Sequence, residues 1–366
     1  MKISESSPAR RLLGLAYGLV AIGLILLFSA SKGIFTRPVA GIFKGGGVFF
    51  WQQLLWITLG TGALVGARRF PYRNFRRLVW LLYPVTIVLL VLVLSLGHGR
   101  ASRWIRIGPF NFQPAEFGKV VLVLTIAAYL AENDINRIAV FIGSLFLAGF
   151  PAALIFKQPN LGTAMILVLI CLVIMFQAGL SLRRLLAVFI TVLVSSPLLW
   201  ITMEPYQKER ILTFLWPQRD PLGRGYNLLQ SKITIGSGGL IGKGYLHGTQ
   251  TKLAFLPEYH TDFIFCLLAE EFGFIGVAIF LGLVYLFLRE ILSIIASTRD
   301  EFARLVASGI FGIFFLQTVI NISMTLGLFP VAGIPLPFIS YGGSFMIVAL
   351  LSVGILANIA ENSVMF

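Results

Sequence analysis

Unbroken apolar runs of about twenty residues recur along the whole chain, and they limit the fold more than any other feature. A bilayer core about 30 Å thick needs about 20 apolar residues per helix, so such runs are typical of transmembrane helices. A transmembrane β-barrel would instead show short segments of alternating hydrophobicity. Composition agrees, since 57% of the 366 residues are hydrophobic and 12% are charged. We therefore expect an all-α, polytopic membrane protein with a single domain over residues 1–366.

Ten segments have the length and apolarity of membrane-spanning helices. They are residues 12–30, 48–67, 78–97, 115–131, 138–156, 161–180, 185–203, 263–288, 305–329 and 343–360. The first segment has basic flanks like a secretory signal, but its apolar run is too long and further segments follow at once, so we expect a retained helix. Ten crossings place both termini on one side of the membrane.

The distribution of Lys and Arg orients these helices. Short connections on the N-terminal side hold fourteen basic residues, whereas those on the opposite side hold seven. Because short cytoplasmic loops are enriched in Lys and Arg, both termini are predicted to be cytoplasmic. The connection 204–260, between predicted helices seven and eight, carries seven more basic residues. A connection of this length translocates largely regardless of charge, so we place it outside the cell.

This topology gathers the irregular segments on the outer side: "HGRASRWIRIGPFNFQPAE", "KQPNLGT", the loop containing "PEYHTDF", and "GIPLPFISYGGS". Ten basic residues lie there against the usual bias and indicate an anionic partner, although any one of them alone also fits a solvated or lipid-facing surface. They are Arg100, Arg103, Arg106, Lys208, Arg210, Arg219, Arg224, Lys232, Lys243 and Lys252. Since activated donors outside the cell must arrive tethered to lipid, a lipid-linked phosphate or pyrophosphate fits this charge.

Two charged side chains, Glu116 and Lys119, lie inside the fourth predicted helix. Three residues apart, they are neighbours on one helical face. Charges within a membrane span usually line a cavity or pair with each other. This pattern leaves two interpretations open. The pair could line a polar substrate cavity, or it could be structural, as an ion pair or with a Lys119 side chain that extends toward the interface.

The most informative segment is "PEYHTDF", residues 257–263, at the start of the eighth predicted helix. Asp262 precedes the apolar run, which suits a helix N-cap and would lower its pKa. It also suits a general base at the mouth of a cavity, with a pKa raised by desolvation or lowered by nearby cations. Glycoside hydrolysis usually needs two carboxylates, whereas displacement of a pyrophosphate needs one base and cations. The pattern therefore favours transfer over hydrolysis.

Two other chemistries fit poorly. The chain has only three histidines and no Cys or His cluster at ligand spacing, so His260 and Asp262 do not predict a zinc site. "GSGGLIGKG", residues 236–244, resembles a phosphate-binding loop but fails the P-loop pattern, because Ser237 and Gly244 occupy required positions. We expect this segment to be a flexible loop over the outer surface.

Several segments together resemble the SEDS (shape, elongation, division and sporulation) family. They are "RWIRIG", "QPAEFGK", "QPNLGTA", "GLFPVAGIPLPFISYGGS" and the long run from "DPLGRGYNLLQ" through "HGTQTKLAFLPEYHTDFIFCLLAEEFG". The resemblance covers nearly the whole chain and is greater to members that act in cell elongation than to those that act in division. One departure is Ala115, where many relatives have Ser.

The resemblance implies a ten-helix peptidoglycan glycosyltransferase that polymerises lipid II on the outer face of the cytoplasmic membrane during elongation and rod-shape maintenance. It implies a class B penicillin-binding protein, a transpeptidase, as partner, contact with membrane lipids and no nucleic acid. On this resemblance Asp262 is the general base that deprotonates the acceptor C4 hydroxyl, and undecaprenyl pyrophosphate leaves with inversion at the donor carbon.

The same resemblance implies substrate contacts elsewhere. Glu116 and Lys119 would line the central cavity, and Arg103, Trp104 and Arg210 would contact the pyrophosphate or sugars. A divalent cation, Mg²⁺ or Mn²⁺, is implied as a helper, although the sequence shows no dedicated set of ligands. Two alternatives remain, a lipid II flippase and a non-catalytic scaffold for a transpeptidase.

Overall fold

The computed structural model describes residues 7–32, 48–96, 103–107, 110–221, 223, 225–253 and 255–362. The structure is 78% helical, with one two-stranded antiparallel sheet in this part of the chain. In chain order the elements are α1 (Pro8–Ser31), α2 (Val48–Arg69), α3 (Tyr72–Leu96), β1 (Ile105–Ile107), β2 (Phe110–Phe112), α4 (Pro114–Leu130), α5 (Ile138–Lys157), α6 (Leu161–Gln177), α7 (Leu182–Thr202), α8 (Pro205–Leu215), η2 (Pro217–Arg219), α9 (Tyr226–Ser237), α10 (Thr249–Lys252), α11 (Ile264–Ser297), α12 (Glu301–Leu326) and α13 (Gly343–Asn362).

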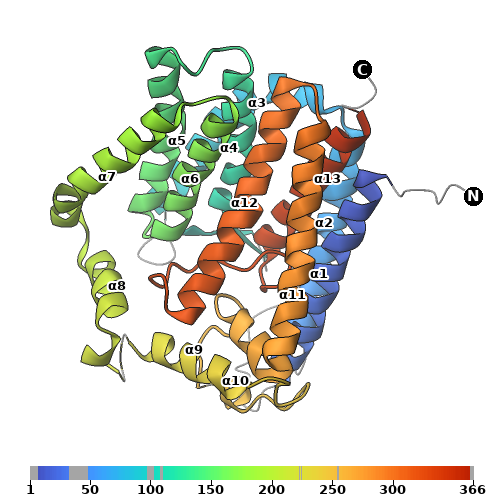
Figure 1. The fold of residues 1–366 in the computed structure, drawn as a ribbon, viewed down its shortest axis with the longest axis vertical. Helices are drawn as coiled ribbons and strands as arrows, with labels where there is room; N and C mark the ends of the chain where they lie inside the picture. The colour runs from blue at the N-terminus through green and yellow to red at the C-terminus, as the bar shows by residue number, and fades with distance from the viewer. Residues whose placement is uncertain are drawn as a thin grey trace, which may run out of the picture.

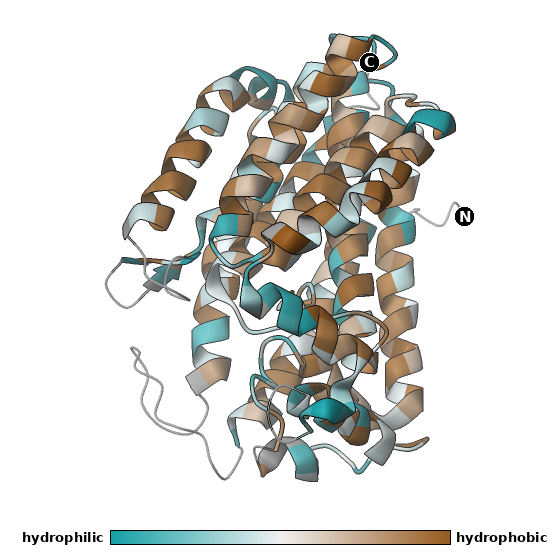
Figure 2. Ribbon diagram, turned by 90° about the vertical axis from the view of Figure 1, so that its left-hand side faces the viewer, coloured by the Kyte–Doolittle hydropathy of each residue, from teal (hydrophilic) through white to brown (hydrophobic). Residues whose placement is uncertain are grey.

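A helix occupies each of the ten segments predicted to be apolar spans, namely α1 to α7 and α11 to α13. Within the described residues six of them, α1, α3, α5, α11, α12 and α13, are long and apolar enough to cross a membrane. The chain is therefore a nearly all-α, multi-pass membrane protein. Hydrophobic residues extend along the long helices, and hydrophilic residues gather near helix ends and in the connections (Figure 2).

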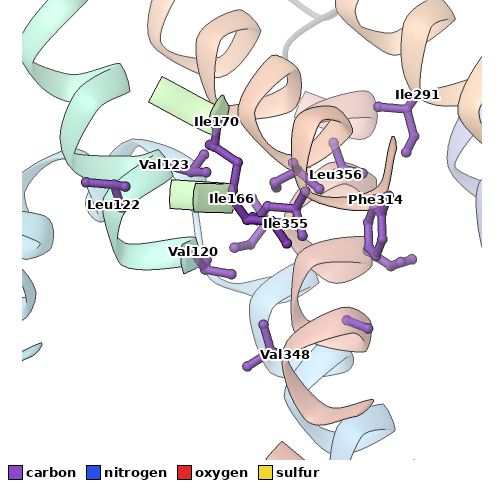
Figure 3. Close-up of a cluster of buried hydrophobic side chains, with 14 of the residues drawn as sticks. Val120, Leu122, Val123, Ile166, Ile170, Ile291, Phe314, Val348, Ile355 and Leu356 are labelled. Carbon is purple, nitrogen blue, oxygen red and sulfur yellow. The ribbon is translucent and has the colours of Figure 1, made fainter. Parts of the chain in front are cut away.

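The core lies where α4, α6, α11, α12 and α13 meet (Figure 3). Val123 of α4 lies beside Ile170 of α6, and Val120 of α4 and Phe314 of α12 belong to the same cluster of buried aliphatic and aromatic side chains. The α2 helix packs along α13, whereas α7 and α8 lie at the periphery of the bundle (Figure 1). This packing fixes the helices on which the candidate site is built.

Ion pairs between helix ends define one end of the bundle, which we call the basic end. Arg11 of α1 pairs with Glu290 near the end of α11 at 3.0 Å. Arg68 at the end of α2 pairs with Glu361 at the end of α13 at 2.6 Å. The predicted N-terminal-side connections therefore meet in space. The turn that precedes α11 lies at the opposite end.

The α11 helix is interrupted at Gly273, whose φ of 62° and ψ of −164° are not helical. Residues 264–272 and 274–297 thus form two helical segments, which agrees with a run too long for one bilayer crossing. Residues 238–244 cover the break: Lys243 and Gly244 donate backbone hydrogen bonds to the carbonyls of Glu270 and Glu271, at 2.9 and 3.0 Å. The prediction of a flexible loop over residues 236–244 is wrong, because these backbone bonds fix it on α11.

Side-chain contacts strengthen this attachment. The carboxylate of Glu270 is fully buried and accepts hydrogen bonds at 2.8 Å from Lys243 Nζ and from the backbone N–H groups of Thr249 and Gln250. A buried carboxylate is stable only with such partners. Glu270 therefore holds the last part of the long connection against the segment that follows Asp262.

We predict that Gly273→Ala lowers the thermal stability of the purified protein in detergent. Its backbone conformation is nearly exclusive to Gly and costs about 1–3 kcal/mol for other residues. A Cβ there would also lie 2.3 Å from the backbone nitrogen of Gly242. Gly282→Ala in the same helix is the control, because nothing lies within 4 Å of its added Cβ. Equal unfolding temperatures for the two variants would contradict the role assigned to the break.

Candidate functional site

The turn that carries Asp262 is held by hydrogen bonds from two other segments. Asn321 of α12, which is fully buried, donates through Nδ2 to the carbonyls of Asp262 at 3.0 Å and Ile334 at 2.7 Å. Ser340 Oγ donates to the carbonyl of Thr261 at 2.6 Å. The N–H of Tyr341 donates to the carbonyl of His260 at 3.0 Å. Three consecutive carbonyls are thus fixed before α11 begins.

The Asp262 side chain does not cap α11. The N-cap position of α11 is Phe263, one residue later, and it makes no side-chain cap hydrogen bond. Instead, Asp262 Oδ2 lies 3.4 Å from the position that a Cβ would occupy on Gly333, whose φ is 64°. The absence of a side chain at Gly333 therefore leaves room beside the carboxylate. The N-cap alternative is wrong, and the group remains available for chemistry.

Burial raises the pKa of Asp262 from an ordinary 3.8 to about 6. The negative charge of Glu258 raises the pKa further, whereas the positive charges of Arg210 and Arg103 lower it. The residue as a whole is half-buried, so protein surrounds it on several sides while part of it still reaches solvent. Arg103 and Arg210 come from distant parts of the chain, yet both act on this one carboxylate.

Arg103 is positioned by the connection between α5 and α6. Its Nε donates to the carbonyl of Gln158 at 3.1 Å, and a terminal nitrogen donates to the carbonyl of Pro159. Trp104 follows at the start of the β1–β2 hairpin, with 44% of its surface exposed. Both residues lie at the end of the bundle where α6 begins.

Arg210 lies on α8, and a capping box fixes the start of that helix. The Gln207 side chain accepts from the N–H of Glu204 at 3.0 Å, and the Glu204 side chain accepts from the third residue of the helix. Arg210 is half-buried. The long connection therefore supplies one cation to the region of Asp262, and the β-hairpin supplies the other.

Glu116 and Lys119 form an ion pair at 2.7 Å, with side chains 4% and 1% exposed. The expectation that they are neighbours on one face is confirmed. Lys119 Nζ also lies 5.5 Å from the ring centre of Phe345, on the first turn of α13. In this conformation the pair is shut off from solvent inside the bundle, so its role in substrate binding stays a prediction.

Sequence reasoning did not identify Asn321 and Ser340, although both fix the Asp262 turn. One signal was present, because an Asn within an apolar span is costly unless its amide has partners. His260 was noticed only as a poor zinc ligand. Its ring stacks on Phe49, with centroids 4.2 Å apart, and burial lowers the pKa of the imidazole, which favours the neutral form.

No group of three or more His, Cys, Asp or Glu side chains at metal-binding distance occurs among the described residues. The carboxylate of Asp262 lies within electrostatic range of Arg103 and Arg210. This arrangement does not fit a cation held by the protein alone. Mg²⁺ is commonly bound through one or two carboxylates together with substrate phosphates. The predicted divalent cation therefore remains an expectation for the substrate-bound protein.

Comparison with known proteins identifies the family of this chain. A family model described as "Cell cycle protein", covering FtsW, RodA and SpoVE, matches residues 10–364. The peptidoglycan glycosyltransferase MrdB of Escherichia coli K12 is 41% identical over 307 residues, which cover 83% of each chain. The peptidoglycan glycosyltransferase RodA of Treponema pallidum is 32% identical, over 92% of this chain and 96% of that protein.

Solved structures agree with these relatives. A chain from a peptidoglycan synthase complex that coordinates polymerization and crosslinking has a TM-score of 0.82 and 30% identity, over 97% of this chain and 98% of that one. The rod shape determining protein RodA of Thermus thermophilus has a TM-score of 0.71 and 28% identity, over 97% of each chain. The match spans the turn, the hairpin and the long connection, so this chain belongs to the FtsW, RodA and SpoVE family of cell cycle proteins, the SEDS family.

Proposed function

We propose that this protein is a peptidoglycan glycosyltransferase of the RodA type that polymerises lipid II during cell elongation, with Asp262 as general base. The observation that carries the assignment of the base is a desolvated carboxylate on a turn fixed by hydrogen bonds, within electrostatic range of two cations, Arg103 and Arg210. The names of the relatives at 41% and 32% identity support the reaction class.

Each residue of the site has a distinct task in this mechanism. Asp262 removes the proton from the C4 hydroxyl of the acceptor sugar, and that oxygen attacks the anomeric carbon of the lipid-linked donor. Arg103 and Arg210 neutralise the charge that develops on the departing pyrophosphate. Undecaprenyl pyrophosphate leaves with inversion. Trp104, exposed beside Arg103, contacts a sugar, and Glu116 with Lys119 borders the deeper part of the substrate path.

The topology follows from the same proposal. Ten helices cross the cytoplasmic membrane, both termini and the basic end are cytoplasmic, and Asp262 faces outward. Charge supports this orientation, because fourteen basic residues occupy the short connections of the proposed cytoplasmic side. A class B penicillin-binding protein is the proposed partner, since a structural neighbour belongs to a complex that couples polymerization to crosslinking.

We expect Asp262→Ala and Asp262→Asn to lower the rate of glycan formation from purified lipid II at least about a hundredfold. The reason is that a general base contributes a factor of about 10²–10⁴ to a rate. The assay contains the purified protein with its transpeptidase partner, with and without a chelator, and resolves glycan chains on a gel. Retained polymerisation by both variants would remove Asp262 from the mechanism. Lipid scrambling by wild-type protein in vesicles without polymer would favour a flippase, and loss of partner binding alone would favour a scaffold.

Polymerisation should also depend on pH through Asp262. The base acts when deprotonated, so below its pKa of about 6 the rate should fall, about tenfold per pH unit. Removing a cation raises the pKa of this carboxyl, so Arg210→Gln should move the acidic limb to higher pH. Arg219→Gln is the control, because it removes an exposed cation of the same connection. An identical limb in all three proteins would contradict the electrostatic role of Arg210.

The ionised carboxylate of Asp262 should lower the free energy of unfolding at neutral pH. Its folded-state pKa of about 6 exceeds its ordinary 3.8, so the folded protein binds more protons between these values and loses stability as pH rises through this window. Asp262→Asn removes the partly desolvated charge, so it should unfold at a higher temperature than wild type at pH 8 and show a smaller difference at pH 5. A lower unfolding temperature for the variant at pH 8 would contradict this sign.

A further inference from the structure

A polar cavity lies at the basic end of the bundle, away from Asp262. Its volume is about 620 Å³, and its lining includes Arg73, Arg76, Arg77 and Trp80 of α3, with Glu132 and Asp300. The α4 and α12 helices separate the two sites: α4 ends just before Glu132, and α12 begins just after Asp300 and carries Asn321 to the Asp262 turn. The cavity is therefore distinct from the proposed active site.

Both carboxylates in this cavity are already engaged. Glu132 pairs with Arg76 at 2.6 Å, and Asp300 accepts a hydrogen bond at 2.8 Å from the N–H of Ala303 as the N-cap of α12. Among the described residues no carboxylate pairs with Arg77. The lining therefore carries more positive than negative charge and is complementary to an anion.

Arg73 and Arg77 stand four residues apart on α3, so their side chains lie on one helical face. Like charges at this spacing destabilise a helix. An anion beside both side chains offsets their positive charge, and two guanidinium groups match the geometry of a phosphate. The pair thus fits a phosphate group better than a single carboxylate.

The same side of α3 continues as exposed apolar surface beyond the cavity. Trp80 is 50% exposed, and Val88 is 62% exposed. A second, apolar groove of about 330 Å³ follows, lined by residues that include Val88, Val91 and Leu92. Trp80 and Val91 are about 16 Å apart along the helix axis, close to the depth of one bilayer leaflet. Trp commonly lies at the membrane interface. Along α3 the guanidinium groups come first, then the indole ring, then the aliphatic side chains. This order matches that of a lipid headgroup, its interface region and its acyl chains.

We propose that the cavity binds the phosphate headgroup of an anionic phospholipid, with the acyl chains lying along the exposed face of α3. Basic pockets between membrane helices are known to take such headgroups. The apolar continuation along α3 favours a lipid over an acidic protein segment, which would need no such surface. The proposal does not depend on the reaction at Asp262.

Native mass spectrometry of the full-length protein in a neutral detergent tests this proposal. Wild type should retain phosphatidylglycerol in preference to phosphatidylethanolamine. Arg73→Gln/Arg77→Gln should weaken phosphatidylglycerol retention at least about tenfold, since each basic residue near a membrane surface contributes to the attraction. Arg10→Gln/Arg183→Gln is the matched control, because it removes the same charge from exposed positions outside the cavity. Equal losses in both double variants would overturn the proposal.

Two further measurements keep the test decisive. The unfolding temperature in phosphatidylethanolamine shows whether the double variant is folded. If the double variant is not folded, the single variant Arg77→Gln takes its place in the lipid-retention measurement. Inorganic phosphate, added up to millimolar concentration, separates the two sources of the anion. Displacement of phosphatidylglycerol by inorganic phosphate at matched concentration would show a site for the free anion and would overturn the assignment to a lipid.

Discussion

The backbone of the turn before α11 is the part on which the candidate site depends. Asn321 and Ser340 bind the carbonyls of Asp262 and Thr261, and Tyr341 binds that of His260. These donors belong to α12 and to the segment before α13, so packing of the last helices fixes a turn about sixty to eighty residues earlier in the chain. These bonds fix the backbone from which the Asp262 side chain extends.

Desolvation and charge then act in opposite directions on that carboxylate. Burial makes Asp262 a stronger base than an exposed Asp, and the two arginines limit the rise of its pKa. The balance suits a base that must be ionised near neutral pH and must lie beside an anionic substrate. Such a site is costly to the folded state, which is common where function and stability compete. The fixed turn, the covered break at Gly273 and the Glu270 contacts supply the compensating structure.

The two ends of the bundle use positive charge differently. At the basic end, arginines pair with Glu290, Glu361 and Glu132, which joins helix ends that are far apart in sequence. At the opposite end, Arg103 and Arg210 influence Asp262 from a hairpin and from the long connection. The first arrangement joins the helices, and the second creates an electrostatic environment for chemistry. The fully buried pair of Glu116 and Lys119 belongs to neither end.

The sequence by itself determined the helices, because apolar runs of membrane length leave the backbone no other way to satisfy its hydrogen bonds. It also indicated Asp262, because the segment around it resembles the SEDS family, and it indicated that Glu116 and Lys119 are neighbours, because helical spacing is local. Only the tertiary structure decided that Asp262 is not a cap, that residues 239–244 are bound to α11, and that the charges of Arg103 and Arg210 act on one carboxylate. Those outcomes depend on contacts between residues distant in sequence, which no local pattern encodes.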